Sequence, residues 1–288
     1  MTAFGCVVLT TGQRPDELRR ALESLLAQEG AGLDVVVVGN GWQPEGLPEG
    51  VRGLALAEDR GIPAGRNAGV PETDGELVFF LDDDASLSDP DALARLAARF
   101  ESDPQLGLLQ LRVDARDGGR PARDWLPRLR VGDRTRSSEL TAVWEGAVVI
   151  RRPLFERIGG WPEEFRYVHE GIDLAWRVMD AGYRVEYAGD IAVLHPEPAP
   201  VPARHAYSLY YGQRNKVWIA RRNLPLLLGI PYGGIFALRA LARSRSVDDV
   251  RAVLRGVRDG IREPCGTRNR VSARTLWRMV RAGRPPLV

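Results

Sequence analysis

The stretch "LVFFLDDDA", residues 77–85, decides both the fold and the place of the site. Its first five residues are apolar, which is typical of a strand buried on both faces, and three aspartates follow immediately. Adjacent carboxylates repel one another, and burying them without partners costs free energy. The three acids therefore belong either to a solvated loop or to a site that holds a cation.

Strand and helix patterns alternate over the first hundred residues. Apolar runs at residues 4–11 and 33–41 predict two further strands, and residues 15–28, 63–70 and 89–102 predict helices. Continuous apolar strands that alternate with helices are typical of a parallel sheet covered on both faces. The sequence therefore predicts an α/β fold that is Rossmann-like, with a mostly parallel central sheet.

Polar residues end each of these predicted strands. Thr10 and Thr11 end the first, Asn40 lies at the end of the second, and the acids end the third. Sheets of this kind bind their ligands at the carboxyl ends of the strands, where loops converge. This placement makes the three acids a candidate site.

The acids have the chemistry of a divalent cation site. Side chains alternate in an extended segment, so Asp82 and Asp84 are expected to point together while Asp83 points away. Paired carboxylates suit Mg²⁺ or Mn²⁺. His195 ends another apolar run, "IAVLHP", and a neutral imidazole there is a candidate third ligand. A solvated turn for the acids and an ordinary strand-end histidine remain the alternatives.

The second half of the chain alternates less regularly. Residues 106–113 and 147–152 have strand patterns, and a long loop rich in Arg, Gly and Asp is predicted between them. Residues 170–183 predict an amphipathic helix, and residues 184–196 predict a pair of strands. The proline-rich run "PEPAPVPA" is the best candidate boundary. We therefore predict a catalytic domain at 1–203 and a basic, mainly helical extension at 204–288.

Composition indicates a globular protein of a reducing compartment. The 288 residues are 44% apolar and 27% charged, which excludes an intrinsically disordered chain. The two cysteines form neither a disulfide framework nor a CxxC metal pair. The first residues enter a strand-like run without the features of a signal peptide, so a cytoplasmic protein is expected.

Positive charge is concentrated after residue 203. This part of the chain holds 18 of the 40 Lys and Arg residues but only 4 of the 38 Asp and Glu residues. Such a segment is expected to meet an anionic partner: phospholipid, nucleic acid or the acidic remainder of the chain. Nucleic acid is not expected, because no recognised nucleic-acid-binding module is present.

Two stretches of the extension bear on membrane contact. The run after Asn223 is apolar for about nineteen residues, but prolines, glycines and Arg239 make it a poor spanning helix. Ser246 and Asp249 form a capping box for a helix at 247–261. Its apolar face adjoins a narrow stripe of arginines, which suits an anionic membrane surface. Packing of this helix on the catalytic domain, or on a sister subunit in a homodimer, is the alternative. The apolar face of this helix consists of Val250, Leu254, Val257 and Ile261, and the arginine stripe consists of Arg251, Arg255, Arg258 and Arg262.

Six motifs in order resemble the family 2 glycosyltransferases with the GT-A fold, an inverting family, and are similar to bacterial rhamnosyl- and galactofuranosyl-type members. The resemblance covers residues 4–196. It implies transfer of a sugar from a nucleotide-diphospho-sugar (UDP-, dTDP- or GDP-linked) to a hydroxyl of a glycan, lipid-linked or small-molecule acceptor. It also favours a peripheral position at the inner face of the cell membrane, because many relatives build lipid-linked glycans there. The motifs are "VVLTT…PDELRRALESLLAQ", "VVVVGNG", "GIPAGRNAG", "LVFFLDDDA", "EGAVVIRRPLFERIGGWPEEF" and "EGIDLAWRVMDAGYRVEYAGDIAVLHP".

The resemblance also implies roles for single residues. The expected ligands of Mn²⁺ or Mg²⁺ are Asp82, Asp84 and His195. The expected contacts of the donor nucleotide and diphosphate are Thr10, Thr11, Arg14, Asn40, Arg66, Asn67, Asp82 and Asp83. The expected lining of the sugar and acceptor pocket is Trp144, Glu145, Gly146 and His169.

The chain departs from the family pattern at two positions. Gly39 stands where relatives have an aspartate that contacts the nucleoside, so base preference does not follow from the sequence. Gly171 stands where relatives have the aspartate that acts as general base. An inverting transfer needs a base near the acceptor hydroxyl. Glu170 is the expected substitute, with Asp173 as a second catalytic or orienting carboxylate.

Two other functions remain open at this level. A nucleotidyltransferase would use a similar sheet and metal aspartates, but it normally has a glycine-rich loop after the first strand, where "LTTGQRPDE" offers one glycine. A sugar-nucleotide-binding protein without transferase activity is the second alternative, because the usual base is missing at Gly171.

Overall fold

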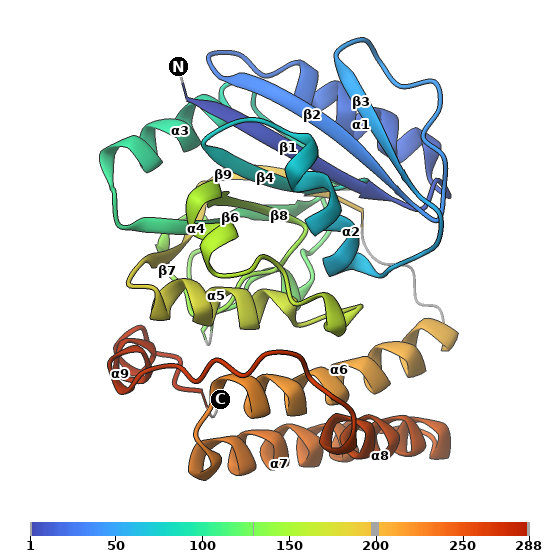
Figure 1. Ribbon diagram of the computed structural model, residues 1–288, viewed down its shortest axis with the longest axis vertical. Helices are drawn as coiled ribbons and strands as arrows, with labels where there is room; N and C mark the ends of the chain where they lie inside the picture. Colours follow the sequence, from blue (N-terminus) through green and yellow to red (C-terminus); the bar gives the residue numbers. More distant parts are fainter. Residues whose placement is uncertain (1, 129, 197–201, 287–288) are drawn as a thin grey trace.

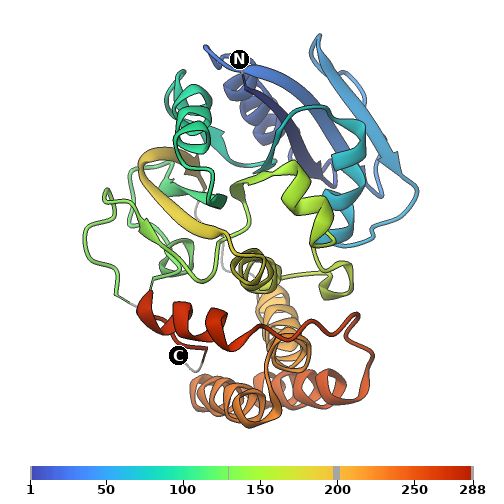
Figure 2. The same ribbon diagram turned by 60° about the vertical axis from the view of Figure 1, so that its left-hand side comes forward.

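The computed structural model describes residues 2–128, 130–196 and 202–286 (Figure 1). A nine-stranded mixed sheet lies at one end of the molecule, and four C-terminal helices lie at the other end (Figure 1 and Figure 2). The α/β expectation is confirmed.

Four strands form a parallel half-sheet; the alternating pattern predicts three of them, and β3 (Val51–Leu56) was not predicted. Their register aligns Leu9 with both Val38 and Asp82, so these strands end at the same edge. Valine, phenylalanine and leucine fill both faces of the inner strands, which is why they are continuous apolar runs. In sheet order the strands are β3 (Val51–Leu56), β2 (Gly32–Asn40), β1 (Ala3–Thr10) and β4 (Leu77–Asp82).

The other half of the sheet is mixed. β8 runs antiparallel to β4, β6 runs antiparallel to β8, and β9 runs parallel to β6. Two reversals restore the first direction, so β9 ends at the same edge of the sheet as β4. The strands are β8 (Ala147–Arg151), β6 (Leu106–Ala115) and β9 (Arg184–His195), with the short β5 (Ser86–Leu87) and β7 (Ser138–Glu139) paired to β9.

β9 is one strand rather than the predicted pair. Its pairing with β6 shifts between Ala188 and Ala192, so the residues between them bulge out of the ladder. Asp190 at the bulge bonds to Arg95 and to Ser137. Gly189 and Asp190 therefore lie in a bulge, and the chain continues to His195 in the same direction.

Each face of the sheet has its own hydrophobic core. Leucines of α1 (Pro15–Leu26) and α3 (Ala92–Ser102) cover one face. The opposite face packs against α4 (Arg152–Arg157) and α5 (Glu170–Asp180), and against α2 (Ile62–Gly69), where Gly65 lies on Leu9 and Gly69 on Val7. A side chain at either glycine would meet these strand residues, so the glycines bring α2 close to the sheet.

The C-terminal extension shares the second of these cores. Trp218, Ile219, Tyr232 and Met279 are buried in it together with residues of α5. The 203/204 boundary stays a prediction, and most of the proline-rich connector lies outside the described residues. The helices are α6 (Pro202–Asn223), α7 (Leu226–Arg243), α8 (Val247–Arg262) and α9 (Ala273–Arg281). In Figure 1, α6 lies between α5 and the outer helices α7 and α8.

Two glycines of α8 lie directly against α6. A Cβ atom on Gly256 would lie 2.4 Å from the Tyr210 carbonyl oxygen, and one on Gly260 would lie 2.8 Å from Val217 Cβ. The close approach leaves Leu254 54% exposed. As predicted, Ser246 caps α8, since its side chain accepts a hydrogen bond from the Asp249 N–H at 3.0 Å.

We expect Gly256→Ala to lower the free energy of unfolding by about 1–3 kcal/mol, because the added methyl group meets a backbone atom that cannot move freely. Gly234→Ala in α7 is the matched control, since nothing lies within 4 Å of its added methyl group. That control should raise stability by about 0.5–1 kcal/mol. Chemical denaturation of both variants measures the difference, and equal stability would contradict the close α6–α8 packing.

Candidate metal and sugar-nucleotide site

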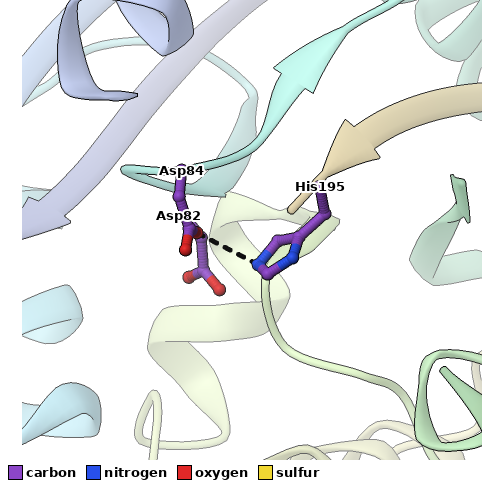
Figure 3. A group of neighbouring side chains, drawn as sticks. All are labelled: Asp82, Asp84 and His195. Atoms are coloured by element: carbon purple, nitrogen blue, oxygen red, sulfur yellow. Dashed lines mark ion pairs between the residues drawn. The ribbon is translucent and has the colours of Figure 1, made fainter. Parts of the chain in front are cut away.

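Three side chains that could bind a metal ion meet at the edge of the sheet where β4 and β9 end (Figure 3). Asp82 ends β4, Asp84 lies in the turn that follows, and His195 ends β9. His195 Nε2 lies 3.0 Å from Asp84 Oδ1, and one ligand atom from each residue lies within 4.8 Å of the other two. The predicted triad therefore exists as a cluster.

The His195 ring is held in one orientation. Its Nδ1 donates a hydrogen bond to the Pro196 carbonyl oxygen at 2.6 Å, and the rings of Trp125 and Trp144 lie 5.1 and 5.3 Å from it. In the neutral ring the free electron pair is then on Nε2, which faces Asp84. Two carboxylates and an imidazole directed at one point fit a divalent cation such as Mn²⁺ or Mg²⁺.

Neighbouring groups shift the pKa values of His195 and Asp84 in opposite directions. Burial lowers the pKa of His195, but the hydrogen bond and charge of Asp84 outweigh this effect and the pKa is raised. Burial raises the pKa of Asp84, but His195 and Arg14 more than offset it and the pKa is lowered. The buried carboxylate of Asp84 is therefore compensated by His195 and Arg14, while the partly exposed Asp82 pairs with Arg66.

Asp83 faces the opposite side, toward β1. Its Oδ2 accepts a hydrogen bond from Thr10 Oγ1 at 2.6 Å, and its Oδ1 lies 2.5 Å from Arg14 Nη2. Arg14 also pairs with Asp84. Burial is the main cause that raises the pKa of Asp83 to about 6, with Arg14 and Thr10 opposing it. The guanidinium of Arg14 thus bridges two of the three acids.

Arg66 connects the triad to a second pair of acids. Its Nη2 lies 2.7 Å from Asp82 Oδ1, its Nη1 lies 3.5 Å from Glu170 Oε1, and it stacks over Trp161 at 5.3 Å. The side chain is 4% exposed. Arg66 therefore holds Asp82 and Glu170 from within the protein, because both of its charged contacts are with these carboxylates.

Glu145 and Glu170 form this second acidic pair. Glu145 Oε1 accepts a hydrogen bond from the Gly171 N–H at 2.7 Å, and Glu170 Oε2 has no hydrogen-bond partner among the described residues. Burial raises the pKa of both carboxyl groups, and the charge of Glu170 raises that of Glu145 further. Glu170 is buried and Glu145 is partly buried, and two acids this close together are disposed to share a proton.

The loop before α5 is strained and is braced by α6. Arg166, Val168 and His169 have φ angles of 59°, 55° and 70°, although none is glycine. Asn215 Nδ2 donates to the carbonyl oxygens of Phe165, Tyr167 and Val168 at 3.0, 2.6 and 2.8 Å. The C-terminal extension thereby shapes the loop that places Glu170.

Asp173 lies apart from this pair, in a buried ionic cluster. Its Oδ2 lies 2.7 Å from Arg177 Nε, and its Oδ1 lies 3.1 Å from Arg222 Nε and 2.7 Å from Asn223 Nδ2. Burial raises its pKa, but the two arginines and the asparagine more than offset this, so the pKa is lowered. Both oxygens are occupied, and the side chain joins α5 to α6.

Asn67 and His169, two more predicted site residues, contact other segments of the chain. Asn67 Nδ2 donates to the Trp161 carbonyl oxygen at 2.9 Å and to Glu163 at 3.0 Å. His169 Nε2 lies beside Gly212 of α6, and burial lowers its pKa. These side chains shape the surrounding loops.

The predicted strand-end residues Thr11 and Asn40 lie at or just beyond the ends of β1 and β2. Thr11 is exposed just beyond β1, while Asn40 is buried and its Nδ2 donates to Asp59 Oδ1 at 2.7 Å. A Cβ atom on Gly39 would lie 2.0 Å from the Trp42 carbonyl oxygen. The glycine that departs from the family pattern is therefore required by the path of the chain at Trp42.

Trp144 and Gly146, which are expected to line the sugar and acceptor pocket, lie against the triad. The Trp144 ring contacts His195, and a Cβ atom on Gly146 would lie 2.4 Å from Asp82 Oδ2. Trp125 and Arg116, whose guanidinium donates to the Asp84 carbonyl oxygen, were not predicted. Neither residue belongs to a periodic segment or a motif, so the sequence gives no signal for them.

Comparison with known sequences agrees with this geometry. The family model described as Glycosyl transferase family 2 matches residues 6–159. O-antigen biosynthesis protein RfbC of Myxococcus xanthus is 28% identical over 222 residues, which cover 67% of this chain and 17% of RfbC. Succinoglycan biosynthesis protein ExoO of Rhizobium meliloti (strain 1021) is 35% identical over 112 residues, which cover 36% of this chain and 32% of ExoO. The chain thus spans less than a third of the length of these relatives.

Solved structures show the same fold. S. aureus TarS 1-349 in complex with UDP-GlcNAc has a TM-score of 0.63 and 16% identity, covering 98% of this chain and 88% of that chain. GalNAc-T7 with UDP, GalNAc and Mn²⁺ has a TM-score of 0.62 and 15% identity, covering 91% and 56%. The mannosyltransferase PcManGT from Pyrobaculum calidifontis, in complex with GDP-Man and Mn²⁺, has a TM-score of 0.56 and 20% identity, covering 99% and 76%. The fold is GT-A.

We expect Asp173→Asn to lower the free energy of unfolding by about 3–5 kcal/mol, because it leaves two buried arginines without their carboxylate. Because the pKa of Asp173 is lowered, its stabilising effect is present at neutral pH and is lost as the pH falls through that lowered pKa. Asp117→Asn on the exposed loop is the matched control. Denaturant titration at pH 7 measures both, and a change below 1 kcal/mol in Asp173→Asn would contradict a structural role.

Proposed function

Because the chain belongs to glycosyl transferase family 2, we propose that it transfers a sugar from a nucleotide-diphospho-sugar to an acceptor hydroxyl, with inversion and with dependence on a divalent cation. The triad of Asp82, Asp84 and His195 carries this proposal. Bound there, Mn²⁺ or Mg²⁺ would offset the charge of the diphosphate and stabilise it as a leaving group.

The residues around the triad have separable tasks in this function. Arg14 is partly exposed, so its guanidinium is available to the diphosphate once the acids hold a cation. Thr10, Thr11 and Asn40 lie on the nucleoside side, at the ends of β1 and β2. Arg66 holds Asp82 in place from within the protein. The donor is proposed to be UDP-, dTDP- or GDP-linked, in line with the nucleotides in the similar structures.

The acceptor side is proposed to lie at Trp144 and the pair Glu145 and Glu170. The Trp144 ring is partly exposed beside His195, and aromatic rings of this kind pack against the apolar faces of sugars. The similar proteins are named for O-antigen and succinoglycan biosynthesis, so a glycan or lipid-linked acceptor is proposed. One of the two glutamates would take the proton of its hydroxyl.

We further propose that the outer helices attach the protein to an anionic membrane surface. α8 turns Val253, Gly256 and Gly260 inward, while Leu254 and Ile261 remain 54% and 62% exposed. At about 100° per residue, the four arginines of the predicted stripe fall beside these exposed apolar side chains. Arg251 and Arg255 pair with aspartates of α8 itself and not with the acidic catalytic domain. An apolar strip with arginines along it matches the boundary between headgroups and acyl chains.

α7 adds apolar surface next to α8. Leu227 and Leu238 are 89% and 68% exposed. By length and composition α7 is the one helix among the described residues that could cross a membrane, and 11% of it is buried. Arg239 and Pro231 within it favour contact with the surface over insertion. A homodimer through the same helices is the competing arrangement.

We expect Asp84→Asn to weaken Mn²⁺-dependent UDP binding at least tenfold and to abolish donor turnover, because the site loses a charged ligand. Isothermal titration with UDP and Mn²⁺ measures binding, after a thermal-shift screen of UDP-, dTDP- and GDP-sugars has selected the donor. Asp117→Asn is the control. Unchanged binding and turnover in Asp84→Asn would refute the metal site, and metal-dependent binding by the wild type without any turnover would indicate a binding protein.

We expect the protein to co-sediment with vesicles of phosphatidylglycerol and to be released by high salt, because each arginine near such a surface contributes about 1 kcal/mol. Replacing Arg251, Arg255, Arg258 and Arg262 with Gln should abolish sedimentation. Replacing Arg19 and Arg20 with Gln on the exposed face of α1 should not. No sedimentation at low salt, together with a dimer in solution, would instead assign the surface to a second copy of the chain.

A further inference from the structure

Position 171 cannot carry a side chain in this structure. A Cβ atom built on Gly171 would lie 2.3 Å from the Val143 carbonyl oxygen and 2.7 Å from Glu145 Oε1. The first of these is a backbone atom, so the conflict is not relieved by rotating a side chain. Glu145 therefore occupies the space that a carboxylate at position 171 would otherwise use.

A hydrogen bond also fixes the Glu145 carboxyl group at position 171. Its Oε1 accepts the Gly171 N–H at 2.7 Å, in the first turn of α5, where helix N–H groups lack partners within the helix. The next residue, Gly146, lies against Asp82, since a Cβ atom there would be 2.4 Å from Asp82 Oδ2. The Glu145 carboxyl group is thus fixed by a hydrogen bond to the residue that lacks a side chain, and the next residue in the chain lies against the metal triad.

Glu170 is less suited to meet an acceptor. Its side chain is 3% exposed, and its Oε1 faces Arg66 at 3.5 Å. Glu145 is only partly buried, so a hydroxyl can approach it from solvent. Acid–base catalysis requires hydrogen-bond reach between the base and the proton that it removes. Accessibility therefore separates two carboxyl groups that the sequence alone leaves equivalent.

We propose that Glu145 is the general base of the transfer and that Glu170 is a positioning residue that acts through Arg66. This inference rests on the proposed function. As the acceptor oxygen bonds to the anomeric carbon, its proton passes to Glu145 Oε2. The bond between the anomeric carbon and the phosphate oxygen breaks, and the nucleoside diphosphate leaves with the electron pair. Glu145 then returns the proton to solvent.

The two glutamates differ in what their removal should do. Glu145→Gln keeps an oxygen that can accept the Gly171 N–H but cannot take a proton. Glu170→Gln removes the carboxyl group that faces Arg66, so Arg66 is held less firmly against Asp82. Burial and the charge of Glu170 raise the pKa of Glu145, which strengthens it as a base once it is ionised.

The test compares Glu145→Gln, Glu170→Gln and the exposed control Glu49→Gln. Donor hydrolysis measures turnover with water as the acceptor, and titration with UDP and Mn²⁺ measures binding. Glu145→Gln should lose about 10²–10⁴-fold in kcat, the usual contribution of a general base, while UDP affinity stays within threefold. Azide is already an anion and needs no base, so it should restore turnover in Glu145→Gln and yield the glycosyl azide of inverted configuration.

Two results would overturn the inference. One is hydrolysis by Glu145→Gln within threefold of the wild type, and the other is azide rescue of Glu170→Gln but not of Glu145→Gln. Both leave wild-type turnover intact, so they overturn this assignment alone. A wild-type protein that binds no nucleotide sugar with Mn²⁺ would overturn the proposed function and this assignment together.

Discussion

Charge compensation at the end of β4 is the constraint on which the site depends. Three consecutive carboxylates are held mostly out of solvent, and Arg14, Arg66 and His195 each lie against at least one of them. These cations come from three different segments of the chain, so the acids are stable there only when the sheet has formed. The same concentration of negative charge is what a divalent cation requires, and a cation bound there would in turn attract a diphosphate.

The C-terminal extension supports the candidate site, because α6 contacts both α5 and the loop before it. Asn215 satisfies three carbonyl groups of the left-handed loop before α5, and Arg222 joins Asp173 in the core. The backbone strain in that loop persists only because α6 fixes it. The helices that carry the exposed apolar strip pack directly on α6, so the proposed membrane surface and the site are parts of one connected structure.

Gly171 lacks the carboxylate that relatives have at this position, and Glu145 brings a carboxylate to it from another part of the chain. Position 171 has no side chain, and the carboxyl group of Glu145, from a loop 26 residues earlier, lies against it. Gly39 shows the same principle without a replacement, because the backbone at Trp42 takes the space. Departures from a family motif thus have a local steric cause in both places.

The sequence by itself determined the strand-end acids, the parallel half-sheet, the helix at α5 and the capping of α8 by Ser246, because each follows from periodicity or local hydrogen bonding. It also located His195, since an apolar run ends there. Only the tertiary structure decided that Asp173 is an internal ion-pair partner, that β9 is one bulged strand, that α8 turns its glycines inward and that Glu145 meets Gly171. These outcomes depend on contacts between segments distant in the chain, and no local pattern encodes which space such segments leave or fill.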